Sequence, residues 1–247
     1  MLNVSACSGF GGGAAAGRPA ITDAPDQSGI LLHFRADTGI TLNGSDVSTW
    51  ADQGTGGYDL TQGDGGRQPA FSATGGPNDT EALVFAGVTG GDGDLQKTGW
   101  SHANPIHYFI VFKIITWGDS EMIFTGTASH SVYMQAPGST SNTILTMTAT
   151  PGALILDGDN INVNGTWYLG SFYYSDSYNS GSLNNATPDS NTDDFGPAAK
   201  IAMGCNTAGT GVKGNFAISE FLAYDEQKTS GDLTAINTYF NDQYALF

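Results

Sequence analysis

The sequence predicts an all-β fold: two packed antiparallel sheets with one short helix at the C-terminal end. Many short segments rich in Val, Ile, Phe, Tyr, Trp and Thr alternate with clusters of Gly, Asp, Asn and Ser, which is typical of strands joined by turns. Glycine supplies 35 of the 247 residues, about twice its usual share of about 7%. So many short strands need two packed sheets to bury their apolar faces.

The predicted elements follow one another from residue 29 to the end of the chain. Residues 1–28 are rich in Gly, Ala and Pro, and they bury too little apolar surface to offset the entropy of ordering. We therefore expect an N-terminal arm at 1–28 and one β-sandwich domain at 29–247. The predicted strands are 30–35, 82–85, 106–116, 121–125, 131–135, 143–148, 153–157, 167–174, 200–204 and 215–224.

The last strand and the helix after it close the predicted domain. Both alternating faces of 216–224 are apolar or small, which favours a central strand. Strict alternation places one set of residues on one face: Phe216, Ile218, Glu220, Leu222 and Tyr224. Beyond a turn at 229–232, Leu233, Ile236 and Phe240 recur at helical spacing. Thr229 or Ser230 can cap a helix of about three turns, which we expect to plug one side of the sandwich.

The acidic net charge of the chain limits the classes of binding partner that we expect. The chain has 8 Lys+Arg against 24 Asp+Glu, a formal net charge of −16. Binding to nucleic acid through phosphates, or to an anionic membrane surface, requires clustered basic residues, so we expect neither partner. No apolar run approaches the roughly 18 residues that a membrane span needs.

The N-terminus and the cysteines give weak signals. Residues 4–7, Val-Ser-Ala-Cys, resemble a lipobox, but neither a basic nor an apolar region precedes them, so we expect an unprocessed N-terminus. Cys7 and Cys205 are the only cysteines. A pair between them stays open, while two free cysteines that act as small hydrophobic residues are the favoured interpretation because no metal-ligand spacing is present.

Short motifs occur in a fixed order along the chain. They are an apolar run ending in Arg-Ala-Asp-x-Gly at 31–40, a Trp-x-Asp turn at 48–54, an Arg-x-Pro-x-Phe step at 66–71, an apolar strand at 82–87, an Ile-x-Glu-x-x-x-Tyr strand at 216–225 and a helix end at 239–244. Together they resemble the concanavalin A-like, laminin-G-like jelly-roll domains of bacterial surface proteins and phage structural proteins. The resemblance implies a jelly-roll sandwich, with Trp50 and Tyr224 as large core residues.

We expect no catalytic residue. Glycoside hydrolases of this fold carry two carboxylates on one strand, and retaining chemistry needs them about 5–5.5 Å apart. The glutamates here are scattered: Glu81, Glu121, Glu220 and Glu226. For Glu220 we expect a structural role, fixing a loop or pairing with Arg35. The histidines lie in no nucleophile or metal motif: His33, His102, His107 and His130. His33 alternates with apolar residues and is interpreted as a satisfied core or edge histidine rather than a base.

Calcium and glycans are the ligands left open. The resemblance implies Ca²⁺ held by loop oxygens, and the candidate clusters are 92–94, 157–160 and 189–194. Asp and Asn also dominate turns for local reasons, so we assign no metal and no cofactor site. A sugar site would need an exposed aromatic platform, and among its candidates only a loop residue such as Tyr178 favours binding. Those candidates are Trp100, Trp117, Tyr173, Tyr174 and Tyr178.

The sequence supports two hypotheses for a non-enzymatic protein. The first is a virion structural protein: a phage capsid decoration (cement) protein, homo-oligomeric, whose 1–28 arm binds the major capsid protein or other virion proteins while the acidic domain faces solvent. The alternative is a carbohydrate-binding, lectin-like module of a tail fibre or of a bacterial surface protein, with an extracellular or cell-surface location. A polysaccharide-cleaving enzyme is disfavoured because the carboxylate pair is missing.

Overall fold

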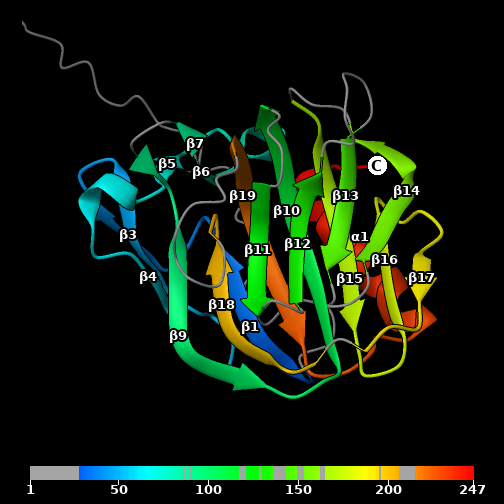
Figure 1. Cartoon of the computed structure of the whole chain (residues 1–247). Helices are drawn as coiled ribbons and strands as arrows, with labels where there is room; N and C mark the ends of the chain where they lie inside the picture. Colours follow the sequence, from blue (N-terminus) through cyan, green and yellow to red (C-terminus); the bar gives the residue numbers. More distant parts are fainter. Residues whose placement is uncertain are drawn as a thin grey trace, which may run out of the picture.

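Two layers of antiparallel strands face each other, and one helix covers the outer side of one layer (Figure 1). The computed structural model describes residues 28–85, 87–88, 91–116, 121–127, 130–135, 143–148, 153–161, 165–194, 196–205 and 215–247. Apart from Ser28, the predicted arm at 1–28 lies outside these residues, as does Cys7. The two-sheet prediction is confirmed.

The helix-bearing layer is built around the longest strands. Its order runs from one edge as β17 (Asp189–Asn191), β16 (Asn179–Leu183), β15 (Trp167–Tyr174), β10 (Ile106–Thr116) and β19 (Asn215–Tyr224). The other edge of β19 pairs with β1 (Ile30–Arg35) and β6 (Ala82–Phe85), and β6 pairs with β5 (Ala70–Ser72). Helix α1 (Ser230–Tyr244) follows β19.

The opposite layer consists of six strands among the described residues. Its order is β9 (Leu95–His102), β18 (Ala198–Met203), β11 (Glu121–Thr127), β12 (His130–Gln135), β13 (Thr143–Thr148) and β14 (Ala153–Ile161). Short elements complete the fold: β2 (Ile40–Asn43), β3 (Asp46–Trp50), β4 (Leu60–Thr61), the hairpin β7 (Gly87–Val88) and β8 (Gly91–Asp92), and the 3₁₀ turns Gly65–Arg67 and Pro77–Asp79. Strand β3 pairs with β5 and β4, and β4 pairs with β9, so the layers join along one side.

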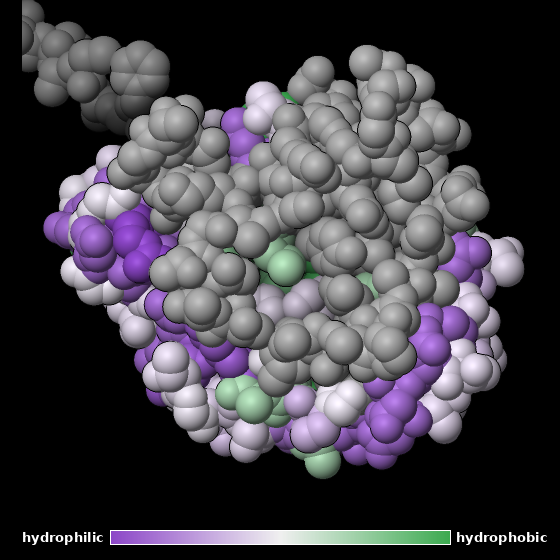
Figure 2. Space-filling view, in the orientation of Figure 1, coloured by the Kyte–Doolittle hydropathy of each residue, from purple (hydrophilic) through white to green (hydrophobic). Residues whose placement is uncertain are grey.

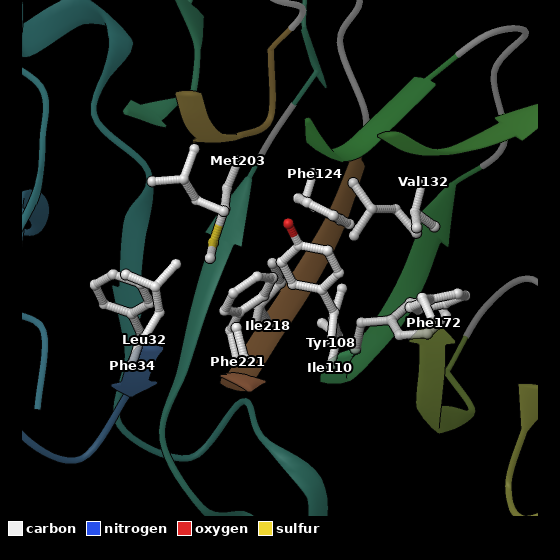
Figure 3. Packing of buried hydrophobic residues seen from close by; sticks show 14 of the residues in the cluster. Leu32, Phe34, Tyr108, Ile110, Phe124, Val132, Phe172, Met203, Ile218 and Phe221 are labelled. Carbon is white, nitrogen blue, oxygen red and sulfur yellow. The ribbon is translucent and has the colours of Figure 1, made fainter. Parts of the chain in front are cut away.

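Aromatic rings from both layers interlock in the core between them. Figure 3 shows Phe124 of β11 above Tyr108 of β10 and Phe221 of β19. The ring of Phe124 lies 4.6 Å from that of Tyr108 and 5.5 Å from that of Phe221, and all three side chains are buried. Trp50 is also buried here, and its Nε1 donates to the backbone oxygen of Arg35 at 2.8 Å. Such interdigitated aromatic pairs bury large areas in favourable geometries.

Strand β19 contains a β-bulge at Ser219. Val111 of β10 pairs with Glu220, but the next residue, Phe112, pairs with Ile218, so Ser219 is the extra residue on β19. A bulge of this kind reverses the alternation of side chains beyond it.

The bulge makes the predicted face assignment of β19 wrong. Phe216 and Ile218 belong to the core between the layers, whereas Leu222 and Tyr224 pack against α1. The alternation argument fails because it assumes that no residue is inserted. Tyr224 is therefore not part of the inter-sheet core that the resemblance implied. The prediction of a central strand is confirmed, since β19 is paired along both edges.

Helix α1 plugs the outer face of its layer, as the sequence predicts. Thr229 is its N-cap: the hydroxyl accepts from the Asp232 N–H, and the Asp232 side chain accepts from the Thr229 N–H, which forms a capping box. The helix buries Ile236, Tyr239, Phe240 and Tyr244 against β10 and β19. It runs fifteen residues, longer than the predicted three turns, because Tyr239 and Tyr244 extend the buried stripe.

The Trp-x-Asp motif fixes a loop by hydrogen bonds. The Asp52 carboxylate accepts from the backbone N–H groups of His33 at 2.9 Å, Gly54 at 2.8 Å and Tyr58 at 3.1 Å. A carboxylate that satisfies three backbone donors orders the loop between β3 and β4.

Hydrophilic side chains gather on the left of Figure 2, in the region of β3, and at its lower right, in the region of β16 and β17.

Candidate functional site

The outer face of the helix-bearing layer changes from apolar to polar where α1 ceases to cover it. Phe109 of β10 and Leu169 of β15 point outward and pack under α1. Two residues before Phe109, the same face of β10 presents His107, and on β15 Ser171 and Tyr173 follow Leu169 at steps of two. Ser171 pairs with Ser182, which continues this face on β16. Side chains two apart on a strand share one face, so the uncovered end of the layer forms a polar floor.

A pocket of about 200 Å³ lies over this floor. Its floor comes from β10, β15 and β16, and its walls from the segment before α1 and from the first turns of the helix. The residues around it are His107, Leu169, Ser171, Tyr178, Ser180, Gly181, Ser182, Asn185, Ala186, Pro188, Gln227, Lys228, Leu233 and Asn237. Tyr178 lies in the loop immediately before β16, with 41% of its surface exposed. The pocket therefore combines hydroxyl and amide groups with an exposed aromatic ring.

His107 on the pocket floor is neutral and holds a defined tautomer. Its Nδ1 accepts the backbone N–H of Lys228 at 3.3 Å, so Nε2 carries the proton and donates to Ser171 Oγ at 2.9 Å. Burial, and then the charge of Lys228, lower the pKa of His107 to about 3. Because Ser171 accepts from His107, its own hydroxyl proton remains for a ligand.

Lys228 is buried beside the pocket with its charge compensated. Its Nζ donates to Glu226 Oε1 at 2.7 Å and to the backbone oxygen of Ser28 at 3.3 Å. The same ammonium lies 3.9 Å from the centre of the Tyr224 ring, a cation–π contact. The cation is therefore satisfied within the protein, and the pocket offers a ligand mainly neutral hydrogen-bonding groups.

The turn after β16 shapes one wall of the pocket. Asn184 and Asn185 both adopt left-handed backbone conformations, with φ of 48° and 61°, which Asn tolerates better than most residues. The Asn184 side chain accepts from the Leu169 N–H at 2.9 Å, which fastens the turn to β15. Asn185 accepts a 2.8 Å hydrogen bond from Asn237 Nδ2 of α1. The turn thereby connects the strand layer to the helix.

Of the predicted platform residues that the structure describes, Tyr178 alone lines this pocket. Trp100, Tyr173 and Tyr174 are buried, with 2%, 7% and 0% exposure, so they cannot act as binding platforms. Trp117 lies outside the described residues. Tyr178 is exposed and lines the pocket, as the loop argument predicts. Sequence reasoning missed the serines and asparagines around it. The alternation of Leu169, Ser171 and Tyr173 in an otherwise apolar strand was the available signal.

The predicted calcium clusters have local partners where their side chains are described. Asp94 is buried, and its Oδ1 pairs with Arg67 at 2.7 Å, so a cation is already present. In 189–194, Asn191 Nδ2 donates to Asp193 Oδ2 at 2.8 Å, which is a turn interaction. The side chains of 157–160 and of Asp92 lie outside the description. In the described part of the chain, no three His, Cys, Asp or Glu side chains gather as metal ligands do.

Glu220 and His33 form a buried structural cluster. Glu220 Oε1 lies 2.6 Å from His33 Nε2 and accepts from the Tyr239 hydroxyl at 3.0 Å. Glu220 sits opposite Arg35 in the β1–β19 register, while the Arg35 guanidinium pairs with Asp37 Oδ2 at 2.6 Å. The prediction that Glu220 fixes a loop is wrong, because its carboxylate instead contacts His33 and holds helix α1 through Tyr239 and Tyr244.

No family model and no curated protein matches the sequence. Among solved structures, the chain is similar to domain 4 of AbnA, a GH43 extracellular arabinanase from Geobacillus stearothermophilus, in complex with arabinotriose. The TM-score of this match is 0.59 and the sequence identity is 16%. The match covers 84% of this chain and 98% of the arabinanase domain. A second match has a TM-score of 0.58 at 13% sequence identity; it is the ligand binding domain of botulinum neurotoxin serotype D in complex with N-acetylneuraminic acid. A GH54 α-L-arabinofuranosidase matches with a TM-score of 0.57 at 11% sequence identity.

These likenesses show the fold. The match covers 86% of this chain and 51% of the neurotoxin chain, and 81% of this chain and 51% of the arabinofuranosidase chain. The chain thus spans about half the length of those two and nearly all of the arabinanase domain. Together with the observed strand layers, the comparisons define a jelly-roll-like β-sandwich domain. None of the helices in the described part of the chain is both long and apolar enough to cross a membrane.

Proposed function

We propose that this chain is a non-enzymatic carbohydrate-binding module whose ligand occupies the pocket beside Tyr178. The observation that carries the proposal is the exposed Tyr178 ring at the rim of a pocket floored by Ser171, Ser180 and Ser182. A sugar ring presents an apolar face of C–H groups and an edge of hydroxyls. The aromatic ring matches the apolar face, and the serine and asparagine side chains match the hydroxyl edge.

The protonation state of the floor favours the same ligand. Neutral His107 fixes Ser171 as an acceptor from Nε2 and leaves its hydroxyl proton to donate. Asn185 and Asn237 add amide groups on the opposite wall. A pocket that both donates and accepts without a free charge suits alcohol groups, which do both.

The comparisons support the proposal by analogy. The arabinanase domain is described in complex with arabinotriose and the neurotoxin domain in complex with N-acetylneuraminic acid. Fold likeness alone does not assign a function, so the pocket carries the argument. An extracellular or cell-surface location, on a bacterial surface protein or a tail fibre, accompanies this proposal. The capsid decoration hypothesis depended on the 1–28 arm, which the structure does not describe, and it stays a prediction.

Glycan binding with matched variants tests the proposal. The intact chain is applied to a glycan array with and without Ca²⁺, and the glycans that bind, together with arabinotriose, are titrated by calorimetry. Tyr178→Ala should weaken binding about tenfold or more, because truncating an aromatic anchor costs more than about 1.4 kcal/mol. Leu42→Ala, which removes another exposed apolar side chain away from the pocket, should bind normally.

Two results would overturn the proposal. One is the absence of binding to every glycan on the array. The other is binding that Tyr178→Ala leaves unchanged, which would move the site elsewhere. Release of reducing sugar from any bound polysaccharide would contradict the non-enzymatic part alone.

A further inference from the structure

A second hollow adjoins the Tyr178 pocket along helix α1. It has a volume of about 210 Å³ and is lined by Asn185, Thr234, Asn237, Thr238, Asn241, Asp242 and Phe247. Thr234, Asn237, Thr238 and Asn241 are three or four residues apart, so they form one continuous stripe on the helix. Asn185 and Asn237 line both hollows. The two hollows therefore adjoin at these two residues, and we refer to them together as the groove.

Each hollow has an exposed ring. Among the described residues, the large apolar side chains that are exposed are Leu42, Tyr178 and Phe247, at 47%, 41% and 50%. Tyr178 lines the first hollow and Phe247 lines the second. The Phe247 backbone N–H donates to Asn241 Oδ1 at 2.9 Å, which holds this residue against the helix. Two of the three exposed apolar side chains thus border the same groove.

The boundary between the hollows is a polar pair. Asn237 Nδ2 donates to Asn185 Oδ1 at 2.8 Å. Each amide has more hydrogen-bonding capacity than this single bond uses, so both side chains can also bind a ligand that crosses the boundary.

The charges along the groove disfavour an anionic ligand. His107 is neutral, and Lys228 is paired with Glu226. The charged side chain among the described residues that line the second hollow is Asp242. The chain as a whole carries a formal net charge of −16, which repels anions over a distance of about 10 Å at moderate salt.

We propose that the two hollows are consecutive subsites for one neutral, linear oligosaccharide, with Tyr178 and Phe247 each stacking on a different sugar unit. This inference rests on the proposed function above and adds the class of ligand: an uncharged chain of several units rather than a single sugar or an acidic glycan. Hydroxyls of the units between the two rings would meet the Asn and Thr side chains of α1.

Chain-length dependence tests this inference. The probes are neutral linear arabino-, xylo-, cello-, laminari- and manno-oligosaccharides of two to six units, with oligogalacturonides as anionic counterparts, all titrated by calorimetry into the intact chain. We expect at least one neutral series to gain affinity about tenfold or more between two and six units. Oligogalacturonides should bind at least tenfold more weakly than neutral chains of equal length at low salt.

Variants then separate the two subsites. Phe247→Ala should remove the gain with length and leave the affinity for the shortest binding probe unchanged, whereas Phe247→Tyr should retain the gain. Tyr178→Ala should weaken short and long probes alike. Leu42→Ala serves as the control for removing an exposed apolar side chain. Phe247 is half exposed, so the variant proteins are expected to fold, and a thermal unfolding scan checks this.

The outcomes separate this inference from the function on which it rests. Binding of no glycan, short or long, overturns both. Binding of short probes with no gain from two to six units, or a gain that Phe247→Ala leaves intact, overturns the two-subsite inference alone. Tighter binding of oligogalacturonides than of neutral chains overturns the choice of ligand class.

Discussion

The hydroxyl of Tyr244 in α1 donates a 2.7 Å hydrogen bond to Glu220 Oε2 in β19, and both side chains are buried. The other carboxylate oxygen contacts His33 in β1 and Tyr239 in α1. Burial and the charge of Glu220 raise the pKa of Tyr239 above its ordinary value, so it remains a donor. One carboxylate therefore ties the helix to the two strands beneath it.

Replacing Tyr244 tests whether its hydrogen bond to Glu220 stabilises the packing of α1 on the sheet. Tyr244→Phe keeps the ring but leaves Glu220 Oε2 without its buried donor, which should lower the free energy of unfolding by about 1–3 kcal/mol. Urea denaturation monitored by circular dichroism measures the change. Tyr178→Phe removes a hydroxyl from an exposed tyrosine and should change stability by less than about 0.5 kcal/mol. Equal effects of the two substitutions would contradict the assignment.

The capping box at the start of α1 gives a second stability prediction. Thr229→Ala removes the hydroxyl that accepts from the Asp232 N–H and should cost about 1 kcal/mol. The control is Thr238→Ala, within the same helix and exposed, where Ala is the better helix former and should not destabilise. Thermal unfolding of both variants checks the prediction, which is wrong if Thr229→Ala unfolds at the wild-type temperature.

His107 makes stability depend on pH. The unfolded imidazole takes up a proton near its ordinary value of 6.5, while burial holds the folded pKa at about 3. Between these values the unfolded state binds more protons, so the stability contribution is lost as pH falls from about 6.5 to about 3 and returns as pH rises. His107→Gln should therefore show a shallower loss of unfolding free energy between pH 7 and 4.

The difference in slope is the informative quantity for His107. The slope of unfolding free energy against pH should differ between wild type and His107→Gln by an amount that approaches one proton per molecule. Denaturant titrations at several pH values measure it. Coincident slopes for wild type and His107→Gln would show that the imidazole titrates normally in the folded state.

Cys205 should resist thiol reagents in the native protein. It is a free, buried thiol, and burial followed by the negative charge of Asp94 raises its pKa to about 12. Because the thiolate is the reactive form, iodoacetamide should label Cys205 only after denaturation. Peptide mapping by mass spectrometry reports this residue separately from Cys7. Rapid native labelling of the peptide containing Cys205 would refute the prediction.

Much of the fold follows from the sequence, because strand length and turn residues are local signals. Ile30–Arg35, Ala82–Phe85, Ile106–Thr116, Thr143–Thr148, Trp167–Tyr174 and Asn215–Tyr224 have the predicted bounds. The short, polar strands were missed: Asp189–Asn191 and Asn179–Leu183 are rich in Ser, Asn and Asp, which are typical of turns. They pair because the apolar strand β15 provides a template at the sheet edge, and that information is not local.

The candidate site was predictable only in part. Tyr178 stood out because it is an aromatic residue within a Ser- and Asn-rich loop. Asn185 and Asn237 are 52 positions apart and become partners only when α1 docks on the sheet. The direction of docking depends on Glu220, whose face is reversed by the Ser219 bulge. An inserted residue leaves no mark in the alternation pattern, so neither the bulge nor the groove could be derived from it.

That inserted residue has a consequence for how the chain can change length. Upstream of Ser219, Phe216 and Ile218 face the space between the sheets, whereas downstream the next residues of that alternating series, Leu222 and Tyr224, pack against the helix. Loss of one residue here would place either Glu220 among aromatic rings or Ile218 against the helix tyrosines. The number of residues inserted into or deleted from this strand therefore matters. A change of two residues keeps each side chain on its present face of the sheet, whereas a change of one residue moves the side chains on one side of the change to the opposite face. Related chains that keep both the helix and the groove should keep the odd residue as well.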